Sequence, residues 1–314
     1  MNNNHPLFYA KILLFGEYGI IEDSMGLSIP FNFYKGKLLF QSSNEHAAAE
    51  SNQALRDFYG FLTSLQAKGE LPCAMNLNQF ASDLDAGMHF DSSIPQGFGV
   101  GSSGAVVAAI YDRYALHKLT PEACSEADEL LKLKLIFARL ESHFHGKSSG
   151  LDPLICYLNL PVLIRSRDEL GTVGLPTENN TGKGGIFLLD TGSPGKTSSM
   201  VSIFLEKLKH EGFRNMIRQQ LVKYNDECIR AFLNRDSKPL FQNLKELSKL
   251  FLENFRPMIP DSFEKLWKEG IESNAYFLKL CGSGGGGFIL GFTQDLELAK
   301  EKLAGHRLEV VYRF

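Results

Sequence analysis

The chain has 314 residues, of which 44% are hydrophobic and 22% are charged, and its formal net charge is −3. This length and composition predict an ordinary globular protein with a substantial core and room for two domains. The small negative charge excludes a general electrostatic attraction to nucleic acid or to an anionic membrane, so we expect neither as a partner. Any phosphate binding must therefore come from local geometry.

The N-terminal residues lack the cationic start and apolar core of a secretory signal. No apolar run approaches the roughly 20 residues that are needed to span a bilayer. The five cysteines are scattered and include no C-x-x-C pair, which predicts free thiols in a reducing compartment rather than a disulfide scaffold or a structural zinc site. We therefore expect a cytoplasmic protein.

The first half of the chain alternates short apolar runs with long helical patterns. The predicted strands are 8–15, 27–31, 34–40 and 155–164. Apolar side chains at helical spacing predict a helix over 52–68. A second long helix is predicted over 121–143, with Pro121 in its first turn.

The second half begins after the segment 177–185 (TENNTGKGG), whose turn-forming residues make it the most linker-like part of the chain. Beyond it, strands are predicted at 185–190, on either side of a glycine turn within 276–292, and at 307–314. The predicted helices are 201–235, 239–255 and a charged helix before the last strand. This order predicts an α+β protein whose two domains are residues 1–183 and 184–314.

A glycine-rich segment, PQGFGVGSSGAVVAA at 95–109, precedes a run of small apolar residues that predicts a buried helix. Glycines let the backbone approach a ligand closely, and the first N–H groups of a helix are unpaired and attract anions. The segment therefore predicts a phosphate site, in which a serine hydroxyl of Ser102 or Ser103 could also coordinate Mg²⁺. The alternative is a flexible loop before a core helix.

Lys11 stands in the middle of the apolar segment 8–15. An ammonium group is costly to bury there unless an acid or a ligand pairs with it, so Lys11 is a candidate site residue. The alternative is a lysine on an edge strand that extends its ammonium into solvent.

Two acids, Glu141 and Asp152, flank the segment ESHFHGKSSGLD. One carboxylate could hold Mg²⁺ while the other accepts a proton from an attacking hydroxyl. The alternative is that both are ordinary surface charges. His143 and His145 invite a metal-site interpretation, which we do not favour because no further ligands follow at a suitable spacing.

The segment KLCGSGGGGF at 279–288 places four consecutive glycines, 284–287, within an apolar hairpin. Such a run is expensive in conformational entropy. A close backbone approach to a ligand or to the first glycine segment would explain it, and a merely flexible turn is the alternative.

The segment GSPGKTSS at 192–199 has the look of a Walker A loop after a strand. The pattern requires glycine at position 190, where the chain has Asp190, and the following residues lack the alternating strands and helices of a P-loop core. We therefore reject a P-loop.

Taken together, these segments resemble the GHMP kinases. KILLFGEYGII is similar to the first motif of that family, PQGFGVGSSGA to the second and KLCGSGGGGF to the third, in the family's order. The resemblance covers most of the chain and implies an N-terminal domain with a left-handed β-α-β unit, a ferredoxin-like C-terminal domain, and ATP with Mg²⁺ as cofactors.

Within the family, the pattern Glu141…HGKSSGLD, which ends at Asp152, is most similar to the mevalonate kinases. Tyr18 stands where the family has histidine, Gly104 where alanine is usual, and Cys281 and Ser283 where threonine and alanine are usual.

The resemblance implies a role for each matching residue. The residues that would bind the nucleotide are Gly97, Gly99, Val100, Gly101, Ser102, Ser103, Gly284 and Gly285. Ser103 and Glu141 would hold Mg²⁺, and Asp152 would accept the proton of the primary alcohol of mevalonate beside Lys11, which steadies developing charge. Glu17, Tyr18 and Thr197 would lie near the substrate.

Three alternatives stay open at this stage. The chain could act on phosphomevalonate or on a sugar, as other GHMP kinases do, or it could be an inactive homologue that binds nucleotide as a regulator. The joint presence of Lys11, Glu141 and Asp152 speaks against an inactive homologue. A small-molecule substrate and ATP are the expected partners, and a homodimer remains open beside a monomer.

Overall fold

The computed structural model describes residues 5–124, 127–179, 181–195 and 197–314. Two compact units divide the chain, and their segments interleave along the sequence. The first unit comprises Met1–Lys11, Pro30–Pro95 and Gly101–Leu160, and the second comprises Ile12–Ile29, Gln96–Val100 and Pro161–Phe314. The domain boundary at residue 183 stays a prediction.

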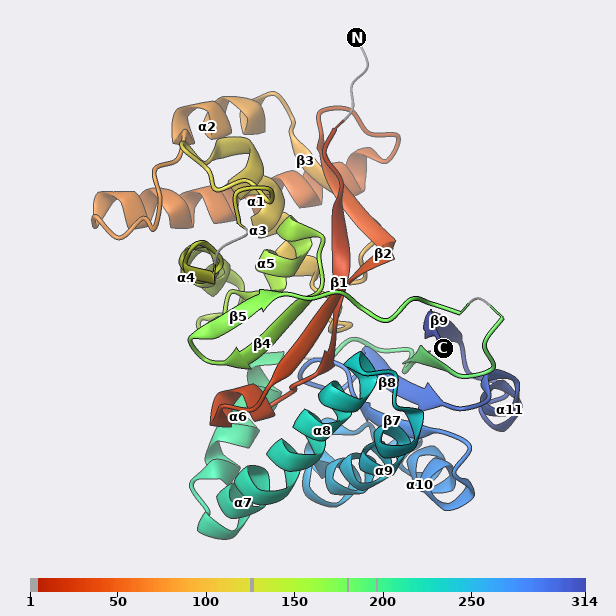
Figure 1. Cartoon of the computed structure of the whole chain (residues 1–314). Coiled ribbons are helices and arrows are strands. Elements are labelled where there is room, and N and C mark those ends of the chain that lie inside the picture. Colours follow the sequence, from red (N-terminus) through yellow and green to blue (C-terminus); the bar gives the residue numbers. More distant parts are fainter. Residues whose placement is uncertain (1–4, 125–126, 180, 196) are drawn as a thin grey trace. The chain divides into compact units, whose positions relative to one another are not determined.

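The first sheet has the strand order β1-β2-β4-β5, and β3 also pairs with β2 (Figure 1). Its strands are β1 (Phe8–Phe15), β2 (Gly26–Leu39), β3 (His89–Ser92), β4 (Val162–Ser166) and β5 (Glu169–Thr172). The two strands predicted at 27–31 and 34–40 are one continuous strand, β2. Residues of β1 and β2 belong to both units.

The strand predicted over 155–164 is wrong in its first part. Residues Leu151–Leu158 form helix α5, which ends at Asn159 in the left-handed conformation (φ 51°), and β4 begins only at Val162. The side chains of α5 are nearly all buried. A short continuous apolar run of this kind does not distinguish a buried helix from a buried strand by its periodicity.

The remaining helices of the first unit are α1 (Glu45–Ala67), α2 (Leu77–Asp85), α3 (Ser102–Tyr114) and α4 (Ala127–His145). Helix α3 packs against α4 and α5, and α1 packs against α2 and β3. Helix α1 starts before the predicted residue 52 because the side chain of Asn44 caps it and accepts a hydrogen bond from Ala47 N at 3.2 Å. Helix α4 starts later than predicted, and Pro121 lies in a turn.

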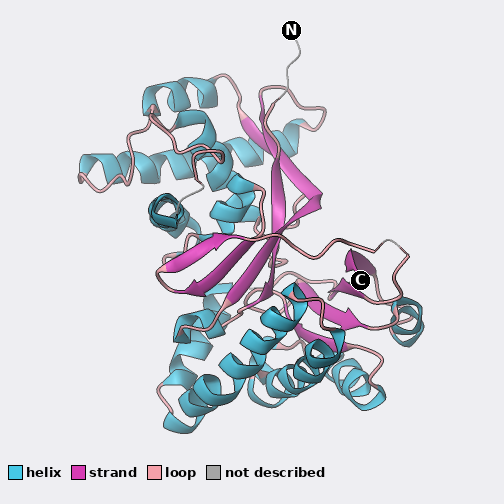
Figure 2. Ribbon diagram, viewed as in Figure 1, coloured by secondary structure: helices cyan, strands magenta, loops and turns pink. Residues whose placement is uncertain are grey.

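The second unit contains an antiparallel sheet with the order β7-β8-β6-β9 (Figure 2). Its strands are β6 (Gly185–Asp190), β7 (Phe277–Leu280), β8 (Phe288–Thr293) and β9 (Leu308–Arg313), with α11 (Leu296–Lys302) before the last one. This β-α-β-β-α-β succession and strand order are ferredoxin-like, as expected.

The chain between β6 and β7 is mostly helical. Its helices are α6 (Thr197–Leu208), α7 (Glu211–Met216), a π-helical turn (Ile217–Leu221), α8 (Val222–Leu233), α9 (Ser237–Asn254) and α10 (Glu264–Ser273), with 3₁₀ turns at Arg256–Met258 and Asp261–Phe263. The segment 201–235, predicted to be mostly helical, is helical apart from a break at residues 209–210 and its last two residues. Helix α9 packs on α8, on α10 and on β7.

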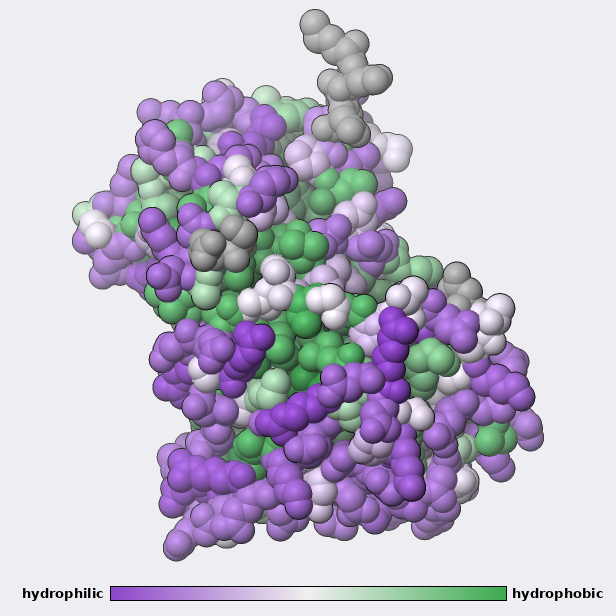
Figure 3. All heavy atoms as spheres, in the orientation of Figure 1, coloured by the Kyte–Doolittle hydropathy of each residue, from purple (hydrophilic) through white to green (hydrophobic). Residues whose placement is uncertain are grey.

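These helices are amphipathic, which is typical of helices that cover a sheet. Trp267 of α10 and Phe251 of α9 are buried, whereas the outer face over α7 to α10 is largely hydrophilic (Figure 3). None of the helices in the described ranges is long and apolar enough to cross a membrane.

Candidate active site

The turn before α3 has the backbone that its glycines predict. Gly97, Gly99 and Gly101 have φ angles of 78°, 79° and 84°, a region that side chains with a Cβ rarely occupy. Gly101 is the N-cap residue of α3, and no side chain of the described residues caps that helix start. The first N–H groups of α3 are therefore available to an anion, which the helix dipole also favours.

The second glycine segment packs against this turn backbone to backbone, within the second unit. A Cβ on Gly99 would lie 2.6 Å from the carbonyl oxygen of Cys281, and one on Gly287 would lie 2.5 Å from the Cα of Phe98. The hydrogen bond from Phe288 N to Phe98 O joins the two segments. The prediction of a close approach between the two glycine segments is confirmed, and the merely flexible turn is wrong.

Gly284 and Gly285 face other parts of the second unit. A Cβ on Gly284 would lie 2.6 Å from Met258 O, and the N–H of Gly285 donates to that same carbonyl at 2.6 Å. The carbonyl of Gly284 lies against Gly195, whose N–H donates to Gly97 O at 2.8 Å. The Walker-like segment therefore supports both glycine segments. A nucleotide contact of Gly284 and Gly285 stays a prediction.

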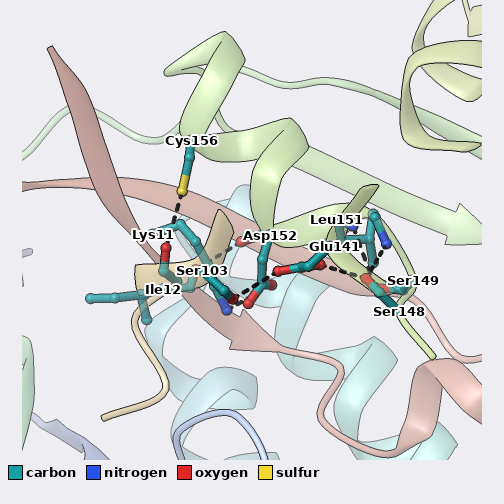
Figure 4. A network of polar contacts seen from close by, with 12 residues as sticks. Lys11, Ile12, Ser103, Glu141, Ser148, Ser149, Leu151, Asp152 and Cys156 are labelled. Atoms are coloured by element: carbon teal, nitrogen blue, oxygen red, sulfur yellow. Dashed lines mark hydrogen bonds and ion pairs between the residues drawn. The ribbon is translucent and has the colours of Figure 1, made fainter. Parts of the chain in front are cut away.

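Lys11 is buried within β1 and pairs with a carboxylate. Its side chain is 3% exposed, and its Nζ lies 2.8 Å from Oδ1 of Asp152, in the first turn of α5 (Figure 4). The alternative of a lysine that extends into solvent is wrong. The side chain of Asp152 is 39% exposed, so a ligand can reach its carboxylate.

The start of α3 touches this ion pair. A Cβ on Gly101 would lie 2.9 Å from Cγ of Lys11, and one on Gly104 would lie 2.8 Å from the backbone carbon of Asp152. Glycine at 104, in place of the family's usual alanine, therefore gives α5 the room to bring its aspartate beside the helix start.

Glu141, on α4, is buried and its two oxygens are bonded separately. Ser103 Oγ donates to Oε1 at 3.0 Å, and Ser148 Oγ donates to Oε2 at 2.5 Å (Figure 4). Burial, and then the negative charge of Asp152, raises the pKa of Glu141 to about 7. An interpretation of Glu141 as a surface charge is wrong, because the residue is only 3% exposed.

Sequence reasoning did not assign Ser148 to the site, and it considered His145 only as a metal ligand. His145 Nε2 lies 3.0 Å from Ser103 Oγ, and burial lowers the pKa of this histidine. Ser148 Oγ also accepts a hydrogen bond from Gly150 N. The only available signal was their place in the HGKSSGLD segment. His143 packs against the rings of Phe58 and Phe61 instead, and no cluster of three metal-ligating side chains occurs in the described residues.

The predicted substrate residues lie in the second unit. Glu17 pairs with Lys279, Nζ to Oε2 at 2.5 Å, and the hydroxyl of Tyr18 donates to Ser283 O at 2.6 Å. Thr197 begins α6, but its side chain lies outside the described part of the chain. A substrate contact of these three residues stays a prediction.

The first unit thus assembles a bare helix start, a lysine–aspartate pair with an accessible carboxylate, and a carboxylate–hydroxyl pair. An anion is favoured at the helix start, and the acidic pair favours a cation beside it. An accessible carboxylate in the same place could accept a proton.

Comparison with known families gives two matches. A model described as the GHMP kinases N terminal domain matches residues 68–159, and one described as GHMP kinases C terminal matches residues 228–307. Together they span more than half of the chain. No curated protein matches the sequence.

Solved structures share the fold at low identity. The mevalonate kinase of L. major, in complex with R-mevalonate, is 15% identical with a TM-score of 0.64, over 99% of this chain and 97% of that one. The phosphomevalonate kinase of Streptococcus pneumoniae, in complex with phosphomevalonate and AMPPNP, is 16% identical with a TM-score of 0.62, over 98% and 99%. The galactokinase of Lactococcus lactis, complexed with galactose, is 12% identical with a TM-score of 0.58, over 99% and 94%.

Replacement of Gly150 by alanine should destabilise the protein strongly. Its φ is 74°, and an added Cβ would lie 2.0 Å from Lys134 O and 2.6 Å from Ala138 N, both backbone atoms of α4. We expect Gly150→Ala to lower the free energy of unfolding by about 2–4 kcal/mol in urea denaturation. Gly146→Ala is the control, since its φ is 71° with nothing near its Cβ. Equal losses in the two variants would contradict the contact with α4.

The raised pKa of Glu141 makes stability depend on pH. Between the unfolded value of 4.5 and the folded value of about 7, the folded state holds a proton that the unfolded state has lost. Stability should therefore fall as pH rises through this window, by about 3 kcal/mol at most. Glu141→Gln should remove this slope in thermal melts with EDTA, while Glu50→Gln, on the exposed face of α1, should retain it. If Glu141→Gln kept the pH dependence of stability of the wild type, that dependence would belong to another group.

Proposed function

The chain belongs to the GHMP kinases, and we propose that it is an ATP-dependent mevalonate kinase. It transfers the γ-phosphoryl group of ATP to the primary alcohol of mevalonate and releases 5-phosphomevalonate and ADP. The observation that carries this proposal is the pairing of buried Lys11 with the accessible carboxylate of Asp152 beside the bare start of α3. Its sequence context, HGKSSGLD with Asp152 eleven residues after Glu141, supports mevalonate within the family.

The turn 97–103 would receive the phosphates of ATP. Left-handed glycines give this turn a backbone that a phosphate can approach closely, and the uncapped start of α3 adds N–H donors. The net charge of the chain supplies no general attraction for a nucleotide, so these local donors carry the affinity. Gly284 and Gly285 are further proposed nucleotide contacts.

Ser103 and Glu141 would hold Mg²⁺, and the residues present fit such an ion. Glu141 is a buried carboxylate whose pKa is raised by burial and by Asp152, so a nearby cation would offset both costs. A hydroxyl and a carboxylate are oxygen ligands of the kind that Mg²⁺ prefers. When bound, the ion would neutralise charge on the phosphates that leave and on the one that is transferred.

Asp152 would act as the general base. Its exposed carboxylate accepts the proton of the acceptor hydroxyl, the hydroxyl oxygen forms the new bond to the γ-phosphorus, and the bond to the ADP oxygen breaks. The ammonium of Lys11, 2.8 Å away, fixes the carboxylate in place and stabilises the negative charge that develops. Phosphoryl transfer needs little covalent help beyond such positioning and electrostatics.

The acceptor can be identified by a substrate panel. We expect ADP release, measured in a coupled assay, with mevalonate and not with phosphomevalonate, galactose or homoserine. Turnover of a sugar or of phosphomevalonate in place of mevalonate would reassign the substrate within the family. Nucleotide binding without turnover of any acceptor would identify an inactive homologue.

Asp152→Asn should lower kcat by about 10²–10⁴-fold, because the amide cannot accept the proton. Nucleotide affinity should stay near the wild-type value, since Asp152 is not among the predicted nucleotide contacts. The matched control is Asp112→Asn, which alters another lysine–aspartate pair, with Lys118 at 2.6 Å, and should leave kcat unchanged. A collapse of ATP affinity with high residual kcat would show that Asp152 is not the base.

A further inference from the structure

Tyr18 has a strained and buried position in the turn after β1. Its φ is 61°, which is uncommon for a residue with a bulky side chain. The residue is 7% exposed, and its ring lies 4.5 Å from that of Phe204 and 5.4 Å from that of Phe255, centroid to centroid. Strain of this kind persists only where the surroundings fix it, so the position of this side chain has a structural cause.

The hydroxyl of Tyr18 is bonded to the second glycine segment. It donates to the carbonyl of Ser283 at 2.6 Å. Burial, and then the charge of Glu17, raises the pKa of Tyr18, so the hydroxyl stays protonated and remains a donor. The preceding residue, Glu17, pairs with Lys279 on β7, four residues before Ser283. Two consecutive residues of the turn therefore hold the same strand and the loop that follows it.

The segment 282–287, to which the hydroxyl of Tyr18 donates, would be flexible without bonds to its surroundings. Glycines on both sides of Ser283 have positive φ angles, 66° at Gly282 and 74° at Gly284, and a run of glycines loses much entropy when it is ordered. The segment needs bonds from outside itself. Gly285 N donates to Met258 O and Gly287 N donates to Ser193 O, each at 2.6 Å, and the hydroxyl of Tyr18 supplies a side-chain bond.

The same segment shapes the turn before α3. The carbonyl of Cys281 lies against Gly99, and the Cα of Gly99 would lie 3.2 Å from a Cβ on Gly282. A displaced 282–287 segment would therefore remove a packing contact of the Gly99 backbone. The bond from Tyr18 lies one residue from this contact.

We propose that Tyr18 is a positioning residue, whose hydroxyl holds segment 282–287 and, through it, the turn at Gly99 in the conformation that binds the phosphates of ATP. It acts on the nucleotide through the loop rather than by touching the acceptor alcohol. The effect of Tyr18 on ATP binding rests on the proposed function, whereas its ordering of segment 282–287 does not.

Hydrogen exchange of the ligand-free protein tests the hold on the loop. In Tyr18→Phe, the amides of Gly285 and Gly287 should exchange several-fold faster than in the wild type, because one of the outside bonds is gone. The matched control is Tyr276→Phe, which removes a buried tyrosine hydroxyl that donates to Leu266 O at 2.8 Å, away from the loop. Unchanged exchange at 282–287 in Tyr18→Phe would overturn the proposal, whether or not the chain phosphorylates mevalonate.

Steady-state kinetics then separate the two ways in which Tyr18 could act. Loss of one hydrogen bond should raise the KM and the dissociation constant for ATP about fivefold, with kcat and the acceptor KM near wild type. Tyr276→Phe should leave all four constants unchanged. An increase confined to the acceptor KM would show that Tyr18 contacts the acceptor and would overturn the proposal. Failure of the wild type to turn over mevalonate would count against the proposed function alone.

Discussion

An ammonium group buried in the middle of a strand constrains everything around it in the first unit. Lys11 on β1 needs a carboxylate within contact distance, because an isolated buried charge is far too costly. Asp152 provides it, which requires α5 to begin beside β1. The glycines at 101 and 104 then follow as steric necessities, since side chains there would collide with Lys11 and with the backbone of Asp152.

The charges gathered at this point do not balance. One ammonium, from Lys11, lies near two carboxylates, those of Asp152 and Glu141, and the pKa of Glu141 is raised first by burial and then by the negative charge of Asp152. A further cation beside Glu141 would therefore stabilise its ionised form. A protein that binds a divalent ion with its nucleotide would retain such an imbalance, because the bound state removes it.

Sequence reasoning predicted the parts of the molecule where only a few residue types are compatible with the backbone conformation or with burial. The glycine turn before α3, the close approach of the second glycine segment to the first, and the pairing of buried Lys11 with an acid each avoid a free-energy cost that the alternatives would carry. The strand order of the second unit was expected from the family resemblance rather than from these costs.

Other features left no comparable signal. The buried residues 155–158 of helix α5 predict a strand as readily as a helix, and the π-helical turn Ile217–Leu221 contains no Gly or Pro to mark it. The bonds from Ser148 to Glu141 and from Tyr18 to Ser283 are tertiary contacts. A serine or a tyrosine is compatible with many environments, so the sequence alone does not indicate them.

The interleaving of the two units has a consequence for how this enzyme can be divided. Each unit is built from three stretches of chain, and β1, β2 and the turn before α3 run from one unit into the other. Severing the polypeptide after Leu160 would thus leave the C-terminal product without Ile12–Ile29 and Gln96–Val100, two of the three stretches of the second unit. Gene fusion or swapping of halves between relatives is for this reason a poor route to new specificities here, and exchange of short loops is the more promising one.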